Sequence, residues 1–388
     1  MGKYKLVVSL ECKITYFKLL TAFPLFFPQN EQAVKKYGSK YGIASKYMVY
    51  NGPFVHKGGL APTSLGSWSR TSTTGTRRMS ADQNQLFCPK VSVNCLQPLP
   101  GRKIGRDHAG KLDGTILDAQ ASKQLTKSKG YTIRKVANTQ YLQFNLKKYS
   151  KFKSTNLRRG ISMAINRSSL SKTLGATYKA ATTLTSSGLT TRTSFTKLAA
   201  SSEAKKYTSY NKQLAKQYFE TGLKEEGLSK LSFTLLASDD DTSKKLAEFV
   251  QSQLETAFGD KITVKVQSIP SKTNLNRVLA GNFECTLYGW IADYADPISF
   301  LDCETTGNSY NYGSWSNKEY DKLIAASKTS SGEAHMKLLA KAENILMVKP
   351  GGNSFNSSQQ GLDDQEQGQG HYLQQCRRLL QLQVCLHR

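Results

Sequence analysis

One segment of the chain, residues 231–288, alternates short apolar runs with helical periodicity, and this order limits the fold more than any other feature. Leu231–Ala237 is an apolar run of strand length, Ile262–Val266 alternates like a strand, and Phe283–Tyr288 is again short and apolar. Two helices are predicted in between, and the second covers Ser271–Ala280. Strand, helix, strand, helix, strand predicts the α/β class, with a mainly parallel sheet and right-handed crossovers.

The ends of the two predicted helices carry matching signals. Ser238 and Asp239–Asp241 precede the first helix, where short side chains cap free N–H groups and negative charge suits the helix dipole. Gly259 and Gly281 stand where the helices should end, because glycine readily adopts the conformation of a C-terminal cap. These signals fix the boundaries between the predicted elements.

The last predicted strand leads through a glycine into an aromatic and acidic loop. The loop ends at Pro297, which has no N–H group and biases Asp296 toward extended geometry. Open α/β sheets bind ligands at the carboxyl ends of their strands, so this loop is a candidate binding site. The alternative is an ordinary strand and turn in which Trp290 belongs to the core. On the residues alone both interpretations stand.

Two motifs near this loop resemble a known family. The stretch G-W-I-A-D-Y-A-D-P-I-S-F-L-D at 289–302 is followed by S-Y-N-Y-G-S-W-S-N-K-E-Y-D-K-L-I at 309–324. Both resemble the oligopeptide-binding proteins that serve peptide ABC importers. Residues 141–170 and 22–54 resemble the same family in the same order, so the resemblance extends over most of the chain.

The resemblance implies an α/β fold of the periplasmic-binding-protein-like type II, with two lobes joined by a hinge. Residues 1–57 would be a first-lobe fragment, and residues 109–137 would be the first-lobe remnant and hinge. Residues 138–347 would form the second, peptide-binding lobe. The first lobe is expected to be incomplete, because Met1 falls well inside the usual chain of the family.

The resemblance also assigns a site. Asp293 is in register with the aspartate that pairs with the α-ammonium of a bound peptide. Trp290 and Tyr294 would form the walls, and the backbone groups of Gly289–Ala292, which include Ile291, would pair with the peptide as an added strand. The alternative is that Asp293 merely caps a turn.

The implied function is capture of extracellular oligopeptides for the permease subunits of an ABC importer, without catalysis and without a cofactor or metal. The family is attached by lipid to the outer face of the cytoplasmic membrane, and a monomer is expected. Within Met1–Phe17 the apolar runs are interrupted by Glu11 and Lys13, so neither a secretory signal nor a lipid-anchor site is predicted in this chain.

The formal charge of +26 is unevenly placed. Residues 121–220 hold 20 Lys and Arg but only two acids, Glu203 and Glu220. Such a balance suggests an anionic neighbour, so a basic surface protein that binds anionic polymer is an alternative function. A solvated basic surface without a dedicated partner is the preferred interpretation. No specific nucleic-acid partner is expected, because no nucleic-acid motif accompanies the charge.

Residues 58–108 and 348–388 break the pattern, because neither helical nor strand periodicity is present. One interpretation is a disordered linker and tail. The other, which is preferred, is translation out of frame. Ser72–Met79 is compatible with bases that another frame reads as F-N-Y-W-D-K-K-N, and the family carries N-Y-W-D near this place. Gly361–Leu373 is compatible with A-W-M-I-K-N-K-V-K-G-I-I-Y in the same way. A pseudogene product without function is therefore a further alternative.

Other chemistry is weakly indicated. Cys12, Cys285 and Cys303 are expected to be small apolar residues. The spacings of the other four cysteines match no common zinc pattern. His335 is expected to be exposed on a helix rather than catalytic. Asp293 and Asp296 could form an acid–base pair, but binding uses Asp293 better and needs no partner base.

Overall fold

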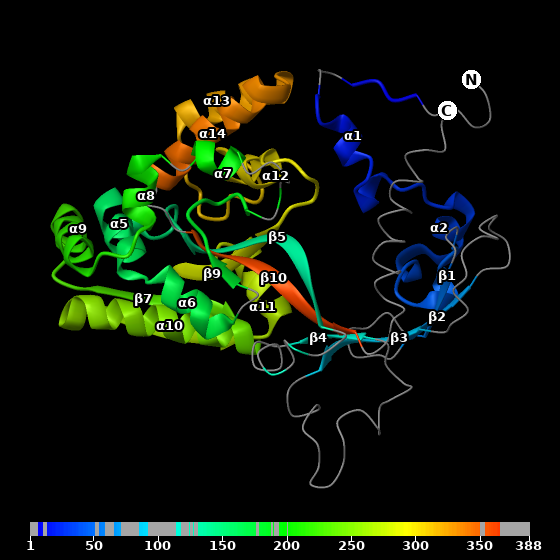
Figure 1. Cartoon of the computed structure of the whole chain (residues 1–388), viewed down its shortest axis with the longest axis horizontal. Helices are drawn as coiled ribbons and strands as arrows, with labels where there is room; N and C mark the ends of the chain where they lie inside the picture. Colours follow the sequence, from blue (N-terminus) through cyan, green and yellow to red (C-terminus); the bar gives the residue numbers. More distant parts are fainter. Residues whose placement is uncertain are drawn as a thin grey trace, which may run out of the picture. The chain divides into compact units, whose positions relative to one another are not determined.

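The structure, a computed structural model, describes residues 7–10, 14–50, 54–58, 66–70, 85–91, 114–117, 124, 127, 131–175, 178–187, 189, 194–199, 201–349 and 354–364. The chain divides into two compact units (Figure 1). The first unit comprises Met1–Phe23 and Lys135–Gln359, and the second comprises Pro24–Arg134 and Gln360–Arg388. The first unit holds the candidate site.

The sheet of the first unit has the strand order β5-β9-β7-β8. These strands are β5 (Tyr131–Phe144), β9 (Cys285–Ile291), β7 (Leu231–Ser238) and β8 (Ile262–Ile269). β7 is parallel to both β8 and β9, whereas β5 is antiparallel to β9. The predicted α/β class with a mainly parallel core is confirmed by this arrangement.

The helices between these strands begin and end at the predicted signals. Asp240 precedes α10 (Asp241–Phe258), and its side chain accepts a hydrogen bond from the Ser243 N–H. Gly259 ends this helix with a φ of +59°, which is unfavourable for residues with a Cβ atom. The second helix, α11, spans Ser271–Leu279 and precedes β9. The local chemistry of the caps therefore determined these boundaries.

A hydrophobic core joins one face of the sheet to four helices. They are α5 (Thr155–Ala164), α6 (Arg167–Leu174), α9 (Lys212–Glu225) and α10. α5 and α9 lie side by side (Figure 1). A Cβ atom at Gly222 would collide with the backbone of Leu157, so only glycine permits this close approach. Full burial of Phe152, Phe219 and Leu235 shows that the core is well packed.

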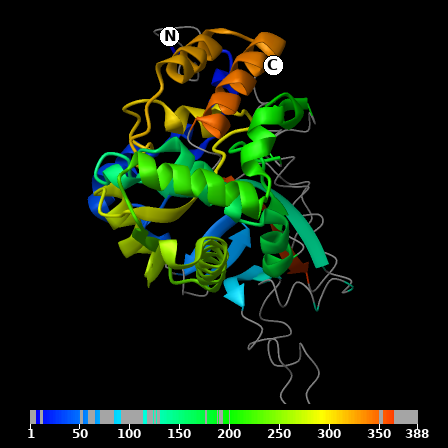
Figure 2. The same cartoon turned by 90° about the vertical axis from the view of Figure 1, so that its left-hand side faces the viewer.

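A second cluster in the same unit packs beside the end of β9. It includes residues of α7 (Ser194–Ala199), α8 (Ser202–Thr208), α12 (Ile298–Leu301), α13 (Lys318–Thr329) and α14 (Gly332–Val348). Figure 2 shows α13 and α14, both orange, side by side. This cluster supports the loop that follows β9.

The remaining helical elements are short. Asn30 caps α2 (Glu31–Tyr37), since its side chain accepts a hydrogen bond from the Ala33 N–H. The others are α1 (Phe17–Leu20), η1 (Pro24–Phe26), η2 (Gly38–Lys40), η3 (Ser45–Tyr47), η4 (Ser150–Phe152), η5 (Gly259–Lys261) and η6 (Asp302–Glu304). Within the described residues, no helix is both long and apolar enough to span a membrane.

Six further strands are β1 (Phe54–Gly58), β2 (Gly66–Arg70), β3 (Gln85–Val91), β4 (Gly114–Leu117), β6 (Tyr178–Ala180) and β10 (Ser354–Asp364). β2 and β3 fall within residues 58–108, and β10 falls within residues 348–388. Regular strands therefore occur in both stretches that lack periodicity. Cys12, Ser72–Met79 and most of Gly361–Leu373 lie outside the described residues, and the reading-frame hypothesis stays a prediction about the gene.

Candidate functional site

Strand β9 is longer than predicted. The strand expected to end at Tyr288 continues through Gly289 and Trp290 to Ile291. The strand is longer because of a tertiary interaction: β5 pairs with β9 as far as Asn138, which is opposite Ile291. The prediction that the strand ends at Tyr288 and that Trp290 lies in the loop is therefore wrong, and three of the six candidate site residues lie on a strand.

The hydrogen bonds at both ends of the β5–β9 ladder fix which way its backbone groups point. The Asn145 N–H donates to the Glu284 carbonyl at 3.0 Å, and the Ala292 N–H donates to the Ala137 carbonyl at 2.9 Å. Backbone groups alternate along an antiparallel pair. The N–H and C=O groups of Gly289 and Ile291 therefore point away from β5.

On that other side β9 has only a short pairing with β7. The paired positions are Leu235 with Cys285 and Leu236 with Thr286. Beyond them, the part of the chain that the structure describes offers no strand partner to Gly289 or Ile291. Open donors and acceptors of this kind are a template for an added strand.

The loop after β9 is held against the start of α12. The Trp290 Nε1–H donates to the Ser299 carbonyl at 2.7 Å, and the Asp293 N–H donates to the Ser299 hydroxyl at 2.9 Å. Asp296 accepts a hydrogen bond from the Ile298 N–H at 3.0 Å, which fixes the turn that leads into the short helix. Both ends of the loop thus have a defined position.

The Asp293 carboxylate is the unpaired charge of this loop. The residue is exposed, and its carboxylate makes no hydrogen bond or ion pair with any residue that the structure describes. Partial burial raises the pKa of the Asp293 carboxyl. The carboxylate belongs to the second residue after Ile291, where the open strand edge ends. It is free to pair with a ligand cation.

Aromatic rings line the same end of the sheet. Tyr294 stacks on Tyr16, with ring centroids 5.6 Å apart and planes at 7°. Trp290 meets Tyr310 edge to face, with centroids 4.9 Å apart. Ile291 is 56% exposed and adds apolar surface. The predicted aromatic residues Trp290 and Tyr294 therefore flank the Asp293 loop in sequence and have fixed ring partners, of which Tyr16 and Tyr310 were not predicted.

Behind the loop, Asp296 and His335 form a buried pair. The exposed fraction is 6% for Asp296 and 4% for His335. The expectation that His335 is exposed is wrong, because the helix α14 presents this residue to the second core cluster. An acid–base pair of Asp293 with Asp296 is also disfavoured, since Asp296 is occupied by His335 and by the Ile298 N–H.

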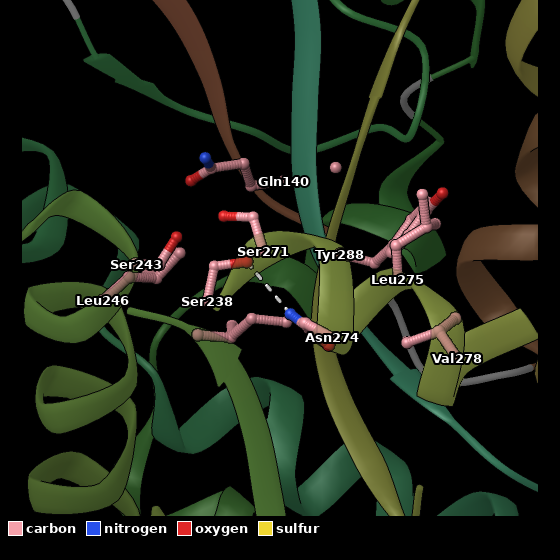
Figure 3. A pocket seen from close by; sticks show the side chains of 11 residues that line it. Gln140, Ser238, Ser243, Leu246, Ser271, Asn274, Leu275, Val278 and Tyr288 are labelled. Carbon is pink, nitrogen blue, oxygen red and sulfur yellow. Dashed lines mark hydrogen bonds between the residues drawn. The ribbon is translucent and has the colours of Figure 1, made fainter. Parts of the chain in front are cut away.

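A cavity of about 190 Å³ opens at the carboxyl end of the sheet, where β7 and β9 separate (Figure 3). β7 supplies Ser238, and the first turns of α10 and α11 supply Ser243, Ser271 and Asn274. The wall from β5 and β9 includes Gln140, Tyr288 and Gly289. Of these residues only Gly289 was predicted from the sequence as a site residue, because they come from five elements that only the fold brings together.

Two of the three cysteines, Cys285 and Cys303, behave as expected. Cys285 and Cys303 are free and buried. Burial raises the pKa of both thiols, so they remain protonated at neutral pH. Within the described part of the chain, no group of three potential metal ligands is found.

Comparisons with known proteins agree on one family. The family model described as bacterial extracellular solute-binding proteins, family 5 Middle, matches residues 106–312. The chain is 33% identical to a dipeptide-binding protein of Lactococcus lactis subsp. cremoris, over 83% of this chain and 59% of the relative. It is 30% identical to the dipeptide-binding protein DppE of Bacillus subtilis, over 88% of this chain and 61% of the relative.

A solved structure shows the same fold. Listeria monocytogenes OppA bound to peptide superposes with a TM-score of 0.76 at 26% identity, over 91% of this chain and 67% of the other. The chain spans about three fifths of the length of the curated relatives that it matches, as the shares of 59% and 61% show.

Proposed function

The chain belongs to family 5 of the bacterial extracellular solute-binding proteins, and from this premise we propose that it binds oligopeptides for an ABC importer. The family predicted from residues 289–302 and 309–324 is confirmed. So is the periplasmic-binding-protein-like type II fold, which the Listeria OppA structure shares. Members of this family are binding proteins. The absence of catalysis in this chain stays a prediction.

The open edge of β9 beside the unpaired Asp293 carboxylate is the observation that carries the proposal. A peptide has two invariant features, its backbone and its charged ends. Gly289 and Ile291 offer backbone groups to the first, and Asp293 offers an anion to the α-ammonium group. A charge-assisted hydrogen bond of this kind is stronger than a neutral one. Both contacts are independent of the peptide sequence, as a general peptide receptor requires.

The two contacts also define a direction. With its α-ammonium at Asp293, a peptide added to β9 runs antiparallel to the strand. Its first residue is then level with Ile291, and its third residue is level with Gly289. Trp290, Ala292 and Tyr294 enclose the ammonium group and lower the local dielectric, which strengthens the ion pair.

The family is extracellular, and we extend this location to the present chain. The proposed partners are the permease subunits of the importer, which receive the loaded protein. We further propose that the protein is a monomer, and that members of this family are attached to the membrane by a lipid anchor. The high positive charge is then a property of the surface. The comparisons supply no support for an anionic-polymer receptor or for a product without function.

Isothermal titration of the full chain tests the proposal. Tetra-alanine with free ends should bind with one site per chain, whereas an equimolar mixture of free amino acids should not compete. Absence of binding by tetra-alanine, or equal competition by free amino acids, would contradict peptide capture.

A further inference from the structure

The cavity between β7 and β9 lies where a bound peptide would place a side chain. β7 ends at Ser238, and the chain then turns into α10, while β9 continues to Ile291 along β5. The resulting gap is a switch point of the sheet, where open α/β folds bind ligands. Gly289, which offers its backbone to the peptide, also lines the cavity. The third peptide residue is level with Gly289.

The size of the cavity suits one side chain. Its volume of about 190 Å³ is below the roughly 300–1,000 Å³ of sites that enclose a whole small ligand. Gly289 itself places no side chain beside the cavity, and the space that its Cβ atom would take is bounded by Asn138 Oδ1 and Gln140 Cγ, each 3.5 Å away.

The lining is polar but carries no charge. All eleven residues that line the cavity are uncharged, and serine, asparagine, glutamine and tyrosine are its polar residues. An ionised side chain placed here would lose water without meeting a charged side chain of the lining, which is costly. The lining therefore disfavours Asp, Glu, Lys and Arg.

Two amide groups of the lining have unsatisfied hydrogen-bonding atoms. Asn274 is 7% exposed, and its Nδ2–H donates to the Ser238 hydroxyl at 3.0 Å (Figure 3). Its Oδ1 atom is buried without a partner among the described residues, and so is Gln140 Oε1. Because a hydroxyl both donates and accepts, reversing the Asn274 amide would merely leave the nitrogen unpaired instead. Buried polar groups require a partner, and a carboxamide matches either orientation.

We propose that this cavity is a specificity subsite for the third residue of the bound peptide, and that it selects an uncharged, hydrogen-bonding side chain such as that of glutamine. The proposal rests on the proposed peptide-binding function and adds a preference to it. Asn274 is the specificity-determining residue, since its amide is the most deeply placed polar group of the lining.

Four tetrapeptides test the subsite by calorimetry with the full chain. They are Ala-Ala-Xaa-Ala, where Xaa is glutamine, glutamate, lysine or norleucine. The glutamine peptide should bind about tenfold more tightly than each of the others, the effect of one or two net hydrogen bonds. Asn274→Leu should reduce the ratio between glutamine and norleucine to about one. Asn276→Leu, on the exposed side of the same helix, should leave the ratio unchanged.

The possible outcomes distinguish the subsite proposal from the peptide-binding function on which it rests. Equal affinity for all four peptides would overturn the subsite while peptide binding stands, and so would an unchanged ratio in Asn274→Leu. Failure of all four peptides to bind would overturn both proposals. The affinity ratio, rather than the affinity, is the readout, so a general loss of stability in Asn274→Leu does not imitate the expected result.

Discussion

His335 Nε2 lies 3.1 Å from both carboxylate oxygens of Asp296, and Nδ1 of the same ring lies 2.7 Å from the Ser327 carbonyl. A carbonyl only accepts hydrogen bonds, so Nδ1 carries a proton. Nε2 faces a carboxylate and also carries one when Asp296 is ionised. The geometry therefore fits an imidazolium–carboxylate pair. It ties α14 to the loop that holds Asp293, three residues before Asp296.

His335→Leu should destabilise the protein by about 3 kcal/mol, because it leaves the buried Asp296 without its cation. Urea unfolding at pH 6 measures the change. Lys341→Leu on the same helix is the control, since Lys341 is exposed and should cost little. A loss below that of the control variant would show that the pair does not stabilise the loop.

The same pair predicts a pH dependence. Burial opposes the charge of His335, but the hydrogen bonds to Asp296 and Ser327 outweigh it and raise the pKa of the imidazole. Because this pKa is raised, the pair contributes fully to folding stability below the unfolded-state pKa of about 6.5. The contribution is lost as pH rises through the folded-state pKa. Tyr16 and Tyr294 also face this region.

Unfolding curves between pH 5 and pH 9 should show the wild type losing more stability with rising pH than His335→Leu. Parallel curves for the two proteins would contradict a charged His335 in the folded state.

Glu304 should also make the folded protein less stable as pH rises. The residue is 5% exposed, and burial raises the pKa of its carboxyl to about 7 despite an opposing hydrogen bond from Gln143. A carboxyl with a raised pKa favours the folded state only while it is protonated. Stability therefore falls as pH rises from the unfolded-state value of about 4.3 to about 7.

Glu304→Gln should therefore stabilise the protein at pH 8, by up to about 3 kcal/mol, and change little at pH 4.5. Urea unfolding at the two pH values measures the difference. Glu319→Gln, an exposed position on α13, should show no such pH dependence. An equal effect of Glu304→Gln at both pH values would contradict a neutral Glu304 in the folded protein.

The sequence predicts those parts of the fold that local chemistry determines. The strands β7 and β8 and the helix α10 follow from apolar periodicity, and Asp240 and Gly259 mark the helix ends by their own conformational preferences. The strand β9 ends three residues later than predicted, because pairing with β5 decides where it ends. No local sequence pattern around Gly289 indicates that β5 pairs with this part of the chain.

The features of the candidate site are likewise of two kinds, those that the sequence shows and those that only the tertiary structure produces. The motif at residues 289–302 identifies the loop and the family, because the spacing of its residues is visible in the sequence. The burial of His335 and the orphaned amide of Asn274 are tertiary properties. Residues close to His335 in the sequence of its helix include charged ones, and its partner Asp296 is remote in the chain. Sequence periodicity therefore could not predict either feature.

The central claim is that Asp293 pairs with the α-ammonium group of a peptide, and one thermodynamic cycle tests it directly. Calorimetry should compare free and N-acetylated tetra-alanine on the wild type and on Asp293→Asn, with the exposed Asp260→Asn as the control. Asp293→Asn should weaken the free peptide by about 2 kcal/mol or more and the acetylated peptide hardly at all, since only the first has a cation to lose. Equal losses for both peptides would show that Asp293 is structural and would contradict the assignment.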